Sequence, residues 1–367
     1  MGTLALNLPA PPQNLETVPS PALLLFPERI QRNIERMLGQ VGGDPARLRP
    51  HVKTHKMSEV VRMQVAAGIT QFKCATLAEA RMTAKAGGLD ILLAYPQVGP
   101  GLAGFLELQQ QFPGIRFSTL VDNPLTLQAF EEAQQPAHLF VDIDCGMGRT
   151  GIHPGPDAIA LCQSIQSNPQ LHFAGLHVYD GHIHEADLGE RTQAFETALA
   201  TWQPMRQTLT DAGMAPNTIV TGGSPTFELF SQHTWQCSPG TTLLWDAGYS
   251  HAHPDLDFEV AALLLTRVVS RPGPNRICLD LGHKAVAAEN PLERRVVFPD
   301  LPDAKPISQS EEHLVLEHPT AEELPPGTPL LVIPWHICPT VALHARAHVV
   351  REGAATDETW AVDARDR

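Results

Sequence analysis

The chain has 367 residues, which is long enough for one large domain or two. Hydrophobic residues make up 43% and charged residues 18%, enough apolar material for a sizeable core and too little charge for a disordered chain. The 26 Lys and Arg against 40 Asp and Glu give a net charge of −14, which repels phosphate backbones, so we do not expect nucleic acid as a partner. No basic amphipathic run suggests a membrane surface.

The N-terminal segment lacks the basic start and long apolar core of a secretion signal. No apolar run approaches the roughly 18 residues that a membrane span needs. The six cysteines form no C-x-x-C pair. These features predict a cytoplasmic protein.

Residues 1–20 are rich in proline and are predicted to form an extended arm that packs with a C-terminal β domain. After it, short apolar runs alternate with segments of helix length, a pattern typical of parallel strands buried on both faces. The predicted strands are 22–26, 49–53, 71–76, 90–96, 117–122, 138–144, 173–179 and 218–223. The predicted helices are 27–41, 56–68, 77–87, 124–134, 155–167 and 189–212.

This alternation predicts an α/β fold, a TIM-type (β/α)8 barrel over residues 21–255. A doubly wound open sheet is the alternative, but no G-x-G-x-x-G opens the first unit. The pattern changes near residue 255, where strand-like runs follow one another with little room for helices. A β-rich domain is therefore predicted over 256–367, with strands in 258–271, 276–282, 313–317, 329–334 and 344–350.

Polar residues follow the predicted barrel strands at their C-terminal ends, where barrel enzymes carry their chemistry. The second strand leads into RPHVKTHK (49–56), and strand alternation places His51 and Lys53 on one face. A lysine facing a barrel interior loses its charge readily and becomes a nucleophile suited to Schiff-base chemistry. By spacing alone, Lys53 fits a salt-bridged core lysine equally well.

Three later strand ends are also polar. Arg149 lies on a glycine-rich loop (142–151) from which it could hold an anion, although a structural Asp–Arg pair is the alternative. The segment 177–185 has three histidines, which could be bases, metal ligands or cofactor contacts. The small residues of 221–226 and 238–242 offer backbone N–H groups that could bind a phosphate.

A last polar group follows an apolar run near the C-terminus. His336 and Cys338 are two residues apart and would share a face in an extended chain. Imidazole and thiolate suit Zn²⁺, and two protein ligands leave coordination positions open for catalysis. The alternative is a buried cysteine beside a hydrogen-bonded histidine.

Together these segments resemble the D-threonine aldolase / D-serine dehydratase family, fold-type III pyridoxal-phosphate enzymes with an alanine-racemase-like barrel and a C-terminal β domain. The motifs that carry the resemblance are RPHVKTHK, KCATLAEA, DIDCGMGRTG, GLHVYDGHIH, TGGSPTF and PWHICPT, spread from residue 49 to 340. The resemblance implies two cofactors, pyridoxal 5′-phosphate and a divalent metal, either Zn²⁺ or Mn²⁺. It also implies a homodimer.

The resemblance assigns roles to individual positions. Lys53 is the expected Schiff-base lysine, with Lys56 as its rival, and Arg149 is expected near the cofactor's phenolic oxygen or the substrate carboxylate. His182 and His184 are the candidate bases, with Glu185 a weaker one. His336 and Cys338 are the expected metal pair, whose ion would bind the β-hydroxyl of the substrate. The full expected cofactor-binding set is Lys53, His51, Arg149, Tyr179, Thr221, Gly222, Gly223, Ser224, Gly240 and Thr241.

The implied activity is that of a lyase acting on D-3-hydroxy amino acids. We favour aldolase-type cleavage of D-threonine to glycine and an aldehyde, because the upstream motifs fit the aldolases better. The alternative is a D-serine or D-3-hydroxyaspartate dehydratase that yields a 2-oxo acid and ammonia. Cys338 favours this alternative, because the aldolases carry Asp where this chain has cysteine.

Three further functions are weaker. A non-catalytic pyridoxal-phosphate-binding protein would not need the region 258–367. An amino-acid racemase would need a C-terminal tyrosine motif that is not evident in the sequence. A zinc-only hydrolase would leave Lys53 and the phosphate-like loops unexplained.

Overall fold

A computed structural model describes residues 6–366, so the first five residues of the predicted arm lie outside the described part. The chain divides into two compact units. The first, here called the sheet unit, comprises described residues up to 36 together with 54–60 and 241–365. The second, here called the barrel unit, comprises 37–53 and 61–240, with residue 366.

The barrel unit is built on a parallel sheet whose strands neighbour one another in chain order. Leu48 bridges to Cys237, and His51 bridges to Lys73, both in parallel, so the segment 48–51 closes the ring between the last strand and the first. This confirms the predicted barrel. The strands are β2 (Gln71–Cys74), β3 (Asp90–Pro96), β4 (Arg116–Val121), β5 (Ala137–Ile143), β6 (Leu171–Val178), β7 (Thr218–Thr221) and β8 (Gln236–Cys237).

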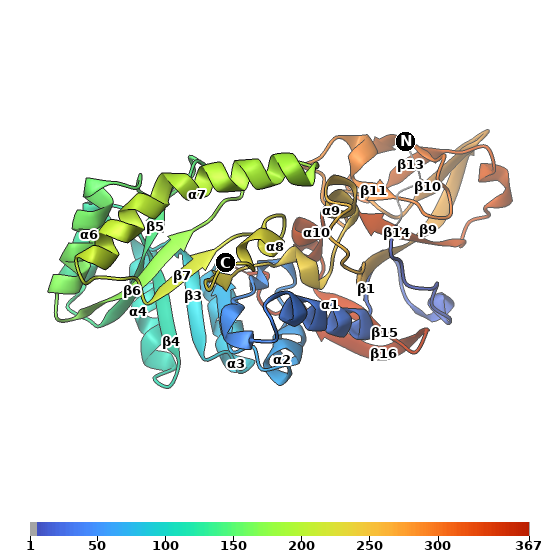
Figure 1. Ribbon diagram of the computed structural model, residues 1–367. Coiled ribbons are helices and arrows are strands. Elements are labelled where there is room, and N and C mark those ends of the chain that lie inside the picture. The colour runs from blue at the N-terminus through green and yellow to red at the C-terminus, as the bar shows by residue number, and fades with distance from the viewer. Residues whose placement is uncertain (1–5, 367) are drawn as a thin grey trace. The chain divides into compact units, whose positions relative to one another are not determined.

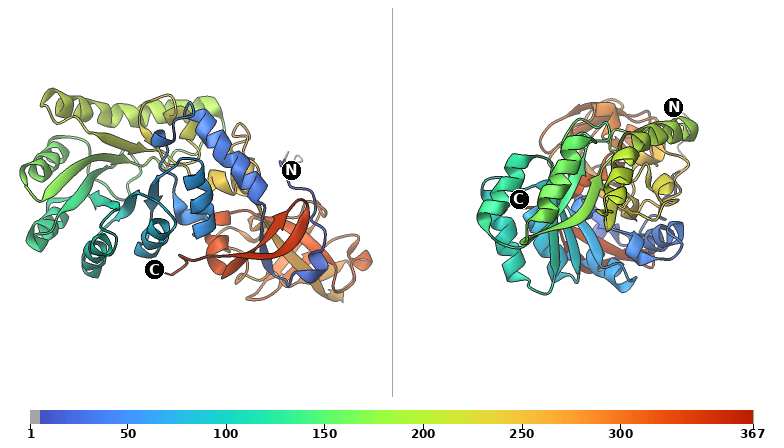
Figure 2. Two further views of the ribbon diagram at one scale, coloured as in Figure 1. Left: turned by 90° about the horizontal axis from the view of Figure 1, so that it is seen from below. Right: turned by 60° about the vertical axis from the view of Figure 1, so that its left-hand side comes forward.

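Helices lie on the outer side of these strands (Figures 1 and 2). Side-chain caps begin three of them: Thr76, Asn123 and Asp187 each accept a hydrogen bond from the N–H three residues on. Thr76 and Asn123 stand two residues after the ends of β2 and β4. The predicted helices form, and two more are present in this part of the chain, α4, which buries Phe105 and Leu108, and the short α8. The helices up to residue 230 are α1 (Pro27–Gln40), α2 (Ser58–Ala66), α3 (Leu77–Lys85), α4 (Pro100–Gln111), α5 (Pro124–Ala133), α6 (Pro156–Ser167), α7 (Leu188–Asp211) and α8 (Phe227–Phe230).

The sheet unit holds a mixed sheet in the order β12-β13-β10-β9-β1-β15-β16, with β14 pairing to both β9 and β11. Gln13 bridges to Ala354 in this unit. Two short helices, α9 (Ala247–Ala252) and α10 (Ile337–Leu343), belong to it. Its strands are β1 (Ala22–Leu25), β9 (Ala262–Gly273), β10 (Arg276–Leu279), β11 (Val296–Val297), β12 (Lys305–Gln309), β13 (Leu314–Glu317), β14 (Pro329–Pro334), β15 (Arg346–Arg351) and β16 (Ala354–Ala361).

The prediction that residues 22–26 form the first barrel strand is wrong. This segment is a strand, β1, but it pairs with β9 and β15 in the sheet unit. All four of its residues are buried, and a run that is apolar on both faces fits the middle of either sheet. The missing eighth barrel strand is supplied by β8, which has only two residues and carries no apolar run.

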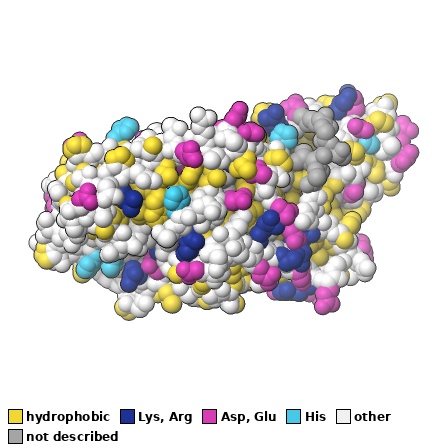
Figure 3. All heavy atoms as spheres, in the orientation of Figure 1, with side chains coloured by type: hydrophobic (Ala, Val, Ile, Leu, Met, Phe, Trp, Pro, Cys, Tyr) yellow, Lys and Arg dark blue, Asp and Glu magenta, His cyan; other side chains and the backbone are white. Residues whose placement is uncertain are grey.

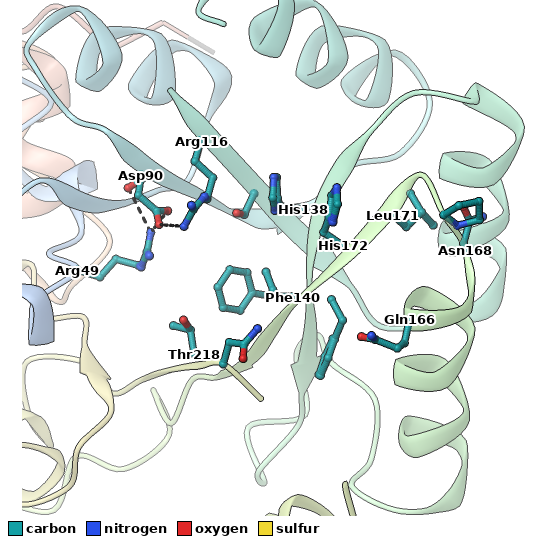
Figure 4. A pocket seen from close by; sticks show the side chains of 15 residues that line it. Arg49, Asp90, Arg116, His138, Phe140, Gln166, Asn168, Leu171, His172 and Thr218 are labelled. Atoms are coloured by element: carbon teal, nitrogen blue, oxygen red, sulfur yellow. Dashed lines mark hydrogen bonds and ion pairs between the residues drawn. The ribbon is translucent and has the colours of Figure 1, made fainter. Parts of the chain in front are cut away.

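The N-terminal ends of the barrel strands surround a cavity of about 530 Å³ (Figure 4). At its edge the buried Arg49 pairs with Asp90, 2.8 Å away, and donates to Gln236 of β8. This ion pair and hydrogen bond tie β3 and β8 to the closing segment 48–51. The polar groups described next lie at the opposite, C-terminal ends of the strands.

None of the helices in residues 6–366 combines the length and apolarity that crossing a membrane requires. On the face drawn in Figure 3, acidic side chains lie among basic ones rather than in a separate field.

Candidate active site

Lys53 follows the closing segment of the barrel. The chain does not continue as a strand to residue 53, as predicted, but turns into a 3-10 helix (Val52–Thr54). The N–H of His51 donates to the carbonyl of Pro239, and the Nδ1 atom of His51 accepts the N–H of Lys53. His51 thus fixes the turn that carries the lysine. The Lys53 Nζ lies 6.0 Å from the ring centre of Tyr179.

Tyr179 follows β6 and is the residue around which the predicted groups gather. Its ring packs on Gly181 and Gly223, where an added Cβ would lie 2.4 Å and 3.3 Å from ring atoms. Arg149 lies 5.1 Å from the ring centre, and a second lysine, Lys73, lies 5.0 Å from it. Three cations from separate segments therefore contact one aromatic ring.

Lys73 was not among the predicted site residues. It is buried at the end of β2, with its Nζ 3.5 Å from Nε2 of His177. The Nδ1 atom of His177 lies 2.6 Å from Asp142, whose second oxygen accepts the hydroxyl of Thr150. The signal available in the sequence was a lysine between two apolar residues, Phe72 and Cys74, near the C-terminal end of a strand.

The electrostatics of this cluster follow from burial. The pKa of Lys73 is lowered to about 7, first by burial and then by the positive charges of Lys53 and Arg149. The negative charges of Asp142 and Asp180 oppose this shift. Burial also lowers the pKa of His177, with Asp142 opposing. Although burial alone would raise the pKa of Asp142, His177 and Thr150 hold it below its usual value.

Asp180 is a second buried carboxyl group beside Tyr179. Neither of its oxygens has a hydrogen bond of normal geometry within residues 6–366. Burial raises its pKa to about 6, against the opposing influence of the Thr226 hydroxyl and the N–H of Gly223. A buried carboxyl group of this kind is costly unless another polar group contacts it.

The predicted phosphate loop is adjacent to Tyr179. Gly222 has φ +70°, and an added Cβ would lie 2.7 Å from the Phe230 ring, so the turn requires glycine. Ser224 accepts the N–H of Gly240 at 3.4 Å, which brings the two predicted segments together. The Thr221 hydroxyl donates to the carbonyl of Gln236. Thr241 belongs to the sheet unit.

The two candidate bases differ in their surroundings. His182 faces the glycine-rich loop, because an added Cβ on Gly146 would lie 3.2 Å from its Nε2. His184 is exposed, with its Nδ1 2.6 Å from the carbonyl of His182. The buried Arg191 donates to the carbonyl of Glu185 and fixes this turn. Of the two histidines, His182 is therefore the better placed to act as a base beside the glycine-rich loop.

Lys56, the rival of Lys53, belongs to the sheet unit. Its Nζ lies 3.5 Å from the carbonyl of Ala364, and its own carbonyl accepts the N–H of Ala364. This pair of contacts gives Lys56 a structural role in holding the C-terminal segment.

His336 and Cys338 lie in the sheet unit where β14 leads into α10. Only His336 has extended backbone angles, because it is the N-cap residue of α10 and Cys338 lies in the first turn of that helix. Their side chains nevertheless interact: burial lowers the pKa of His336, but the hydrogen bond and charge of Cys338, with Asp246 and Glu289, raise it to about 9. The Nδ1 atom of His336 lies 2.7 Å from Glu289.

Two threonines and an aspartate complete the surroundings of this pair. The Sγ of Cys338 lies 3.2 Å from the Thr54 hydroxyl and 3.7 Å from that of Thr241. The buried Asp246 accepts the N–H of Tyr249 with one oxygen and that of Ile337 with the other, so it caps α9 and α10 together. Within residues 6–366, no three His, Cys, Asp or Glu side chains gather as a complete metal site.

The parallel barrel, with a lysine and a phosphate-type loop at its strand ends, defines an alanine-racemase-like protein. Residues 27–247 match the family model for the alanine racemase N-terminal domain, and 261–350 match the model named "Putative serine dehydratase domain". The chain is 31% identical to a D-threonine aldolase of Arthrobacter sp. over 99% of this chain and 97% of that protein. It therefore belongs to the family of D-threonine aldolases, 3-hydroxyaspartate aldolases and dehydratases, and D-serine dehydratases.

Two further relatives cover nearly the whole chain. The crystal structure of the D-threonine aldolase from Filomicrobium marinum has a TM-score of 0.87 and 28% identity, over 97% of this chain and 99% of that one. A D-threo-3-hydroxyaspartate dehydratase of Delftia sp. is 27% identical over 89% of this chain and 93% of its own. Solved variants of that dehydratase replace a histidine and a cysteine two positions apart, and the cysteine variant is described as metal-free.

Proposed function

We propose that this protein is a lyase dependent on pyridoxal 5′-phosphate and a divalent metal that cleaves D-3-hydroxy amino acids, with D-threonine giving glycine and acetaldehyde. One observation carries the proposal: Lys53, Arg149 and the Gly222–Gly223 loop all lie around Tyr179 at the C-terminal ends of the barrel strands. The Arthrobacter aldolase, similar over almost the full chain, supports the choice of reaction.

The barrel unit fits an anionic cofactor. Lys53 and Arg149 bring positive charge to one ring, and the loop at Gly222 and Gly223 leaves no room for larger side chains. When bound, pyridoxal phosphate supplies an electron sink for charge that develops at the substrate's α carbon. Lys53 is the amine that would hold it, because Lys56 is held by Ala364 in the other unit.

The remaining barrel residues have roles set by their chemistry. The guanidinium of Arg149 would bind a carboxylate or phenolate oxygen. The Tyr179 ring would position the cofactor beside the phosphate loop. His182 is the candidate general base, because its Nδ1 is buried without a partner in the described part of the chain and its Nε2 faces the glycine-rich loop.

The sheet unit fits a divalent metal ion. His336 would bind it through Nε2, since Nδ1 is held by Glu289, and Cys338 would bind it through Sγ. When bound, the ion supplies a Lewis acid that lowers the pKa of a coordinated hydroxyl group. Two protein ligands leave positions for substrate and water. Zn²⁺ suits the thiolate best, and Mn²⁺ is the second candidate.

A dehydratase is the second candidate function, and Cys338 is the observation that favours it. The Delftia dehydratase has histidine and cysteine at the same spacing as His336 and Cys338. Such an enzyme would release ammonia and a 2-oxo acid instead of glycine. The homodimer and the cytoplasmic location remain predictions.

Product analysis of the purified protein, loaded with pyridoxal phosphate and Zn²⁺ or Mn²⁺, separates these functions. D-threonine, L-threonine and D-serine are supplied in parallel, with the Lys53→Ala variant as the control. Glycine and acetaldehyde from D-threonine alone would support the aldolase, whereas a 2-oxo acid and ammonia would establish the dehydratase. A visible cofactor band with no product from any of the three would point to a non-catalytic binding protein or a racemase.

A further inference from the structure

The cluster beneath Tyr179 contains a lysine for which the proposed reaction has no use. Lys73 is 3% exposed, yet its Nζ faces the same aromatic ring as Lys53 and Arg149. A buried ammonium group is costly, and such groups normally pair directly with a carboxylate. Within residues 6–366 Lys73 makes no ion pair with a carboxylate, so its charge is not neutralised by a direct partner.

The surroundings of Lys73 hold its amine in place. Asp142 is ionised and bonds to Nδ1 of His177, so we assign the histidine proton to Nδ1. The Nε2 lone pair of His177 then accepts an N–H of Lys73 at 3.5 Å. Asp142 is itself held by Thr150. The arrangement therefore orients the Lys73 amine towards the site instead of neutralising it.

We propose that Lys73 is a second lysine of the cofactor site, a positioning residue held by His177 and Asp142 whose positive charge controls how tightly the barrel unit retains an anionic cofactor. This inference rests on the proposed function, because it concerns the site at which pyridoxal phosphate would bind. It concerns binding of the cofactor and not the reaction on it.

The charge of Lys73 changes within the physiological pH range. Its pKa is lowered to about 7 by burial and then by Lys53, while Asp142 and Asp180 oppose the shift. The other charged groups that face it are Arg149 and the largely neutral His177. Below pH 7 the ammonium form attracts an anion, and above pH 7 the neutral amine does not. Cofactor affinity is therefore expected to fall as the pH rises through 7.

Calorimetric titration with pyridoxamine 5′-phosphate tests the proposal. This probe carries the phosphate and the phenolic oxygen but no aldehyde, so the reaction of Lys53 does not contribute. Titrations from about pH 6 to about pH 9 compare the wild type with Lys73→Met, Lys73→Arg and the matched control Lys85→Met. Lys85 is an exposed lysine at the end of α3, outside the site.

Each variant has a distinct expected result. Lys73→Met should bind pyridoxamine phosphate about tenfold more weakly than the wild type at pH 6, a factor that corresponds to about 1.4 kcal/mol. Its affinity should no longer fall as the pH rises through 7. Lys73→Arg keeps its positive charge, so its affinity for pyridoxamine phosphate should be high at low pH and remain high above pH 7. Lys85→Met should behave as the wild type.

Two outcomes would overturn the inference: wild-type affinity and pH dependence in Lys73→Met, or a wild-type loss of affinity above pH 7 in Lys73→Arg. The arginine variant decides the question even if the methionine variant does not fold. A wild-type protein that binds neither pyridoxamine phosphate nor pyridoxal phosphate would instead overturn the proposed function itself.

Discussion

The Nδ1 atom of His336 lies 2.7 Å from Oε1 of Glu289, so the imidazole is held by a carboxylate from a separate segment of the sheet unit. Metal-binding histidines are commonly oriented in this way, with one nitrogen on a carboxylate and the other on the ion. Glu289→Gln should therefore weaken metal binding roughly 10- to 100-fold. Competition with a chromogenic chelator measures the affinity, and Glu293→Gln, an exposed acid on the same segment, is the control.

A second prediction concerns the identity of the metal. Cys338→Ala should remove stoichiometric metal, because His336 alone is a weak site. Cys338→Asp should restore binding but shift the preference from Zn²⁺ towards Mn²⁺, since carboxylate is the harder ligand. Metal content after dialysis against a mixture of both ions measures the preference. An unchanged metal content in Cys338→Ala would remove Cys338 from the proposed site.

A third prediction separates the two lysines of the RPHVKTHK segment. Lys53→Ala should abolish the visible absorbance of bound pyridoxal phosphate, because Lys53 is the amine beside Tyr179. Lys56→Ala should keep the band and lose some stability, since Lys56 contacts Ala364. Absorbance spectra and borohydride trapping followed by peptide mapping measure both. A trapped cofactor on residue 56 in the wild type would reverse the assignment.

The barrel could be predicted from sequence because its strands are short apolar runs followed by amphipathic helices. Which strands pair with one another could not be predicted from the sequence. The run 22–26 and the barrel strands are equally apolar, so nothing in the segment itself says that β1 pairs with β9. β8 has two residues, too few for any periodicity, and only its bridge to Leu48 reveals it.

The site shows the same limit. Lys53, Tyr179 and Arg149 could be predicted because each stands in a polar segment at a strand end. Lys73 and Asp142 are separated by almost 70 residues, and only barrel closure brings both of them to His177, which contacts each. The spacing of His336 and Cys338 places them on one face only if the chain is extended, and nothing in the segment showed that α10 begins at that point.

A fourth prediction concerns acid stability. His55 is fully buried; its Nδ1 accepts the N–H of Met57, and burial lowers its pKa from 6.5 to about 3. Because the unfolded chain binds a proton below about pH 6.5 and the folded protein does not, the free energy of unfolding falls as the pH drops through that range. At pH 5 the loss from His55 is about 2 kcal/mol.

His55→Asn keeps an acceptor for Met57 but cannot be protonated in this range. The loss of unfolding free energy between about pH 7 and pH 5 should therefore be smaller in His55→Asn than in the wild type by about 2 kcal/mol. Urea unfolding at both pH values measures it. Equal losses in the two proteins would mean that His55 is already charged in the folded protein.

The last prediction uses the N-terminal end of the barrel, where Arg49 and Arg116 share one carboxylate, Asp90 (Figure 4). The Arg49 side chain is 2% exposed and that of Arg116 is 62% exposed. Replacement by methionine should therefore cost more stability at Arg49 than at Arg116. Arg49→Met should destabilise the protein by about 1–3 kcal/mol, because it removes the buried cation beside Asp90 and the donor to Oε1 of Gln236. Arg116→Met should cost about 1 kcal/mol or less.

Thermal unfolding measures the loss of stability, and cofactor binding at low temperature measures separately whether the folded variant still holds the cofactor. Both arginines lie at the end of the barrel opposite Lys53, so neither substitution should alter the visible cofactor band of the folded protein. A band lost in Arg49→Met while the protein is still folded would show that closure of the barrel between β8 and β2 is needed to hold the Lys53 turn, which His51 joins to Pro239.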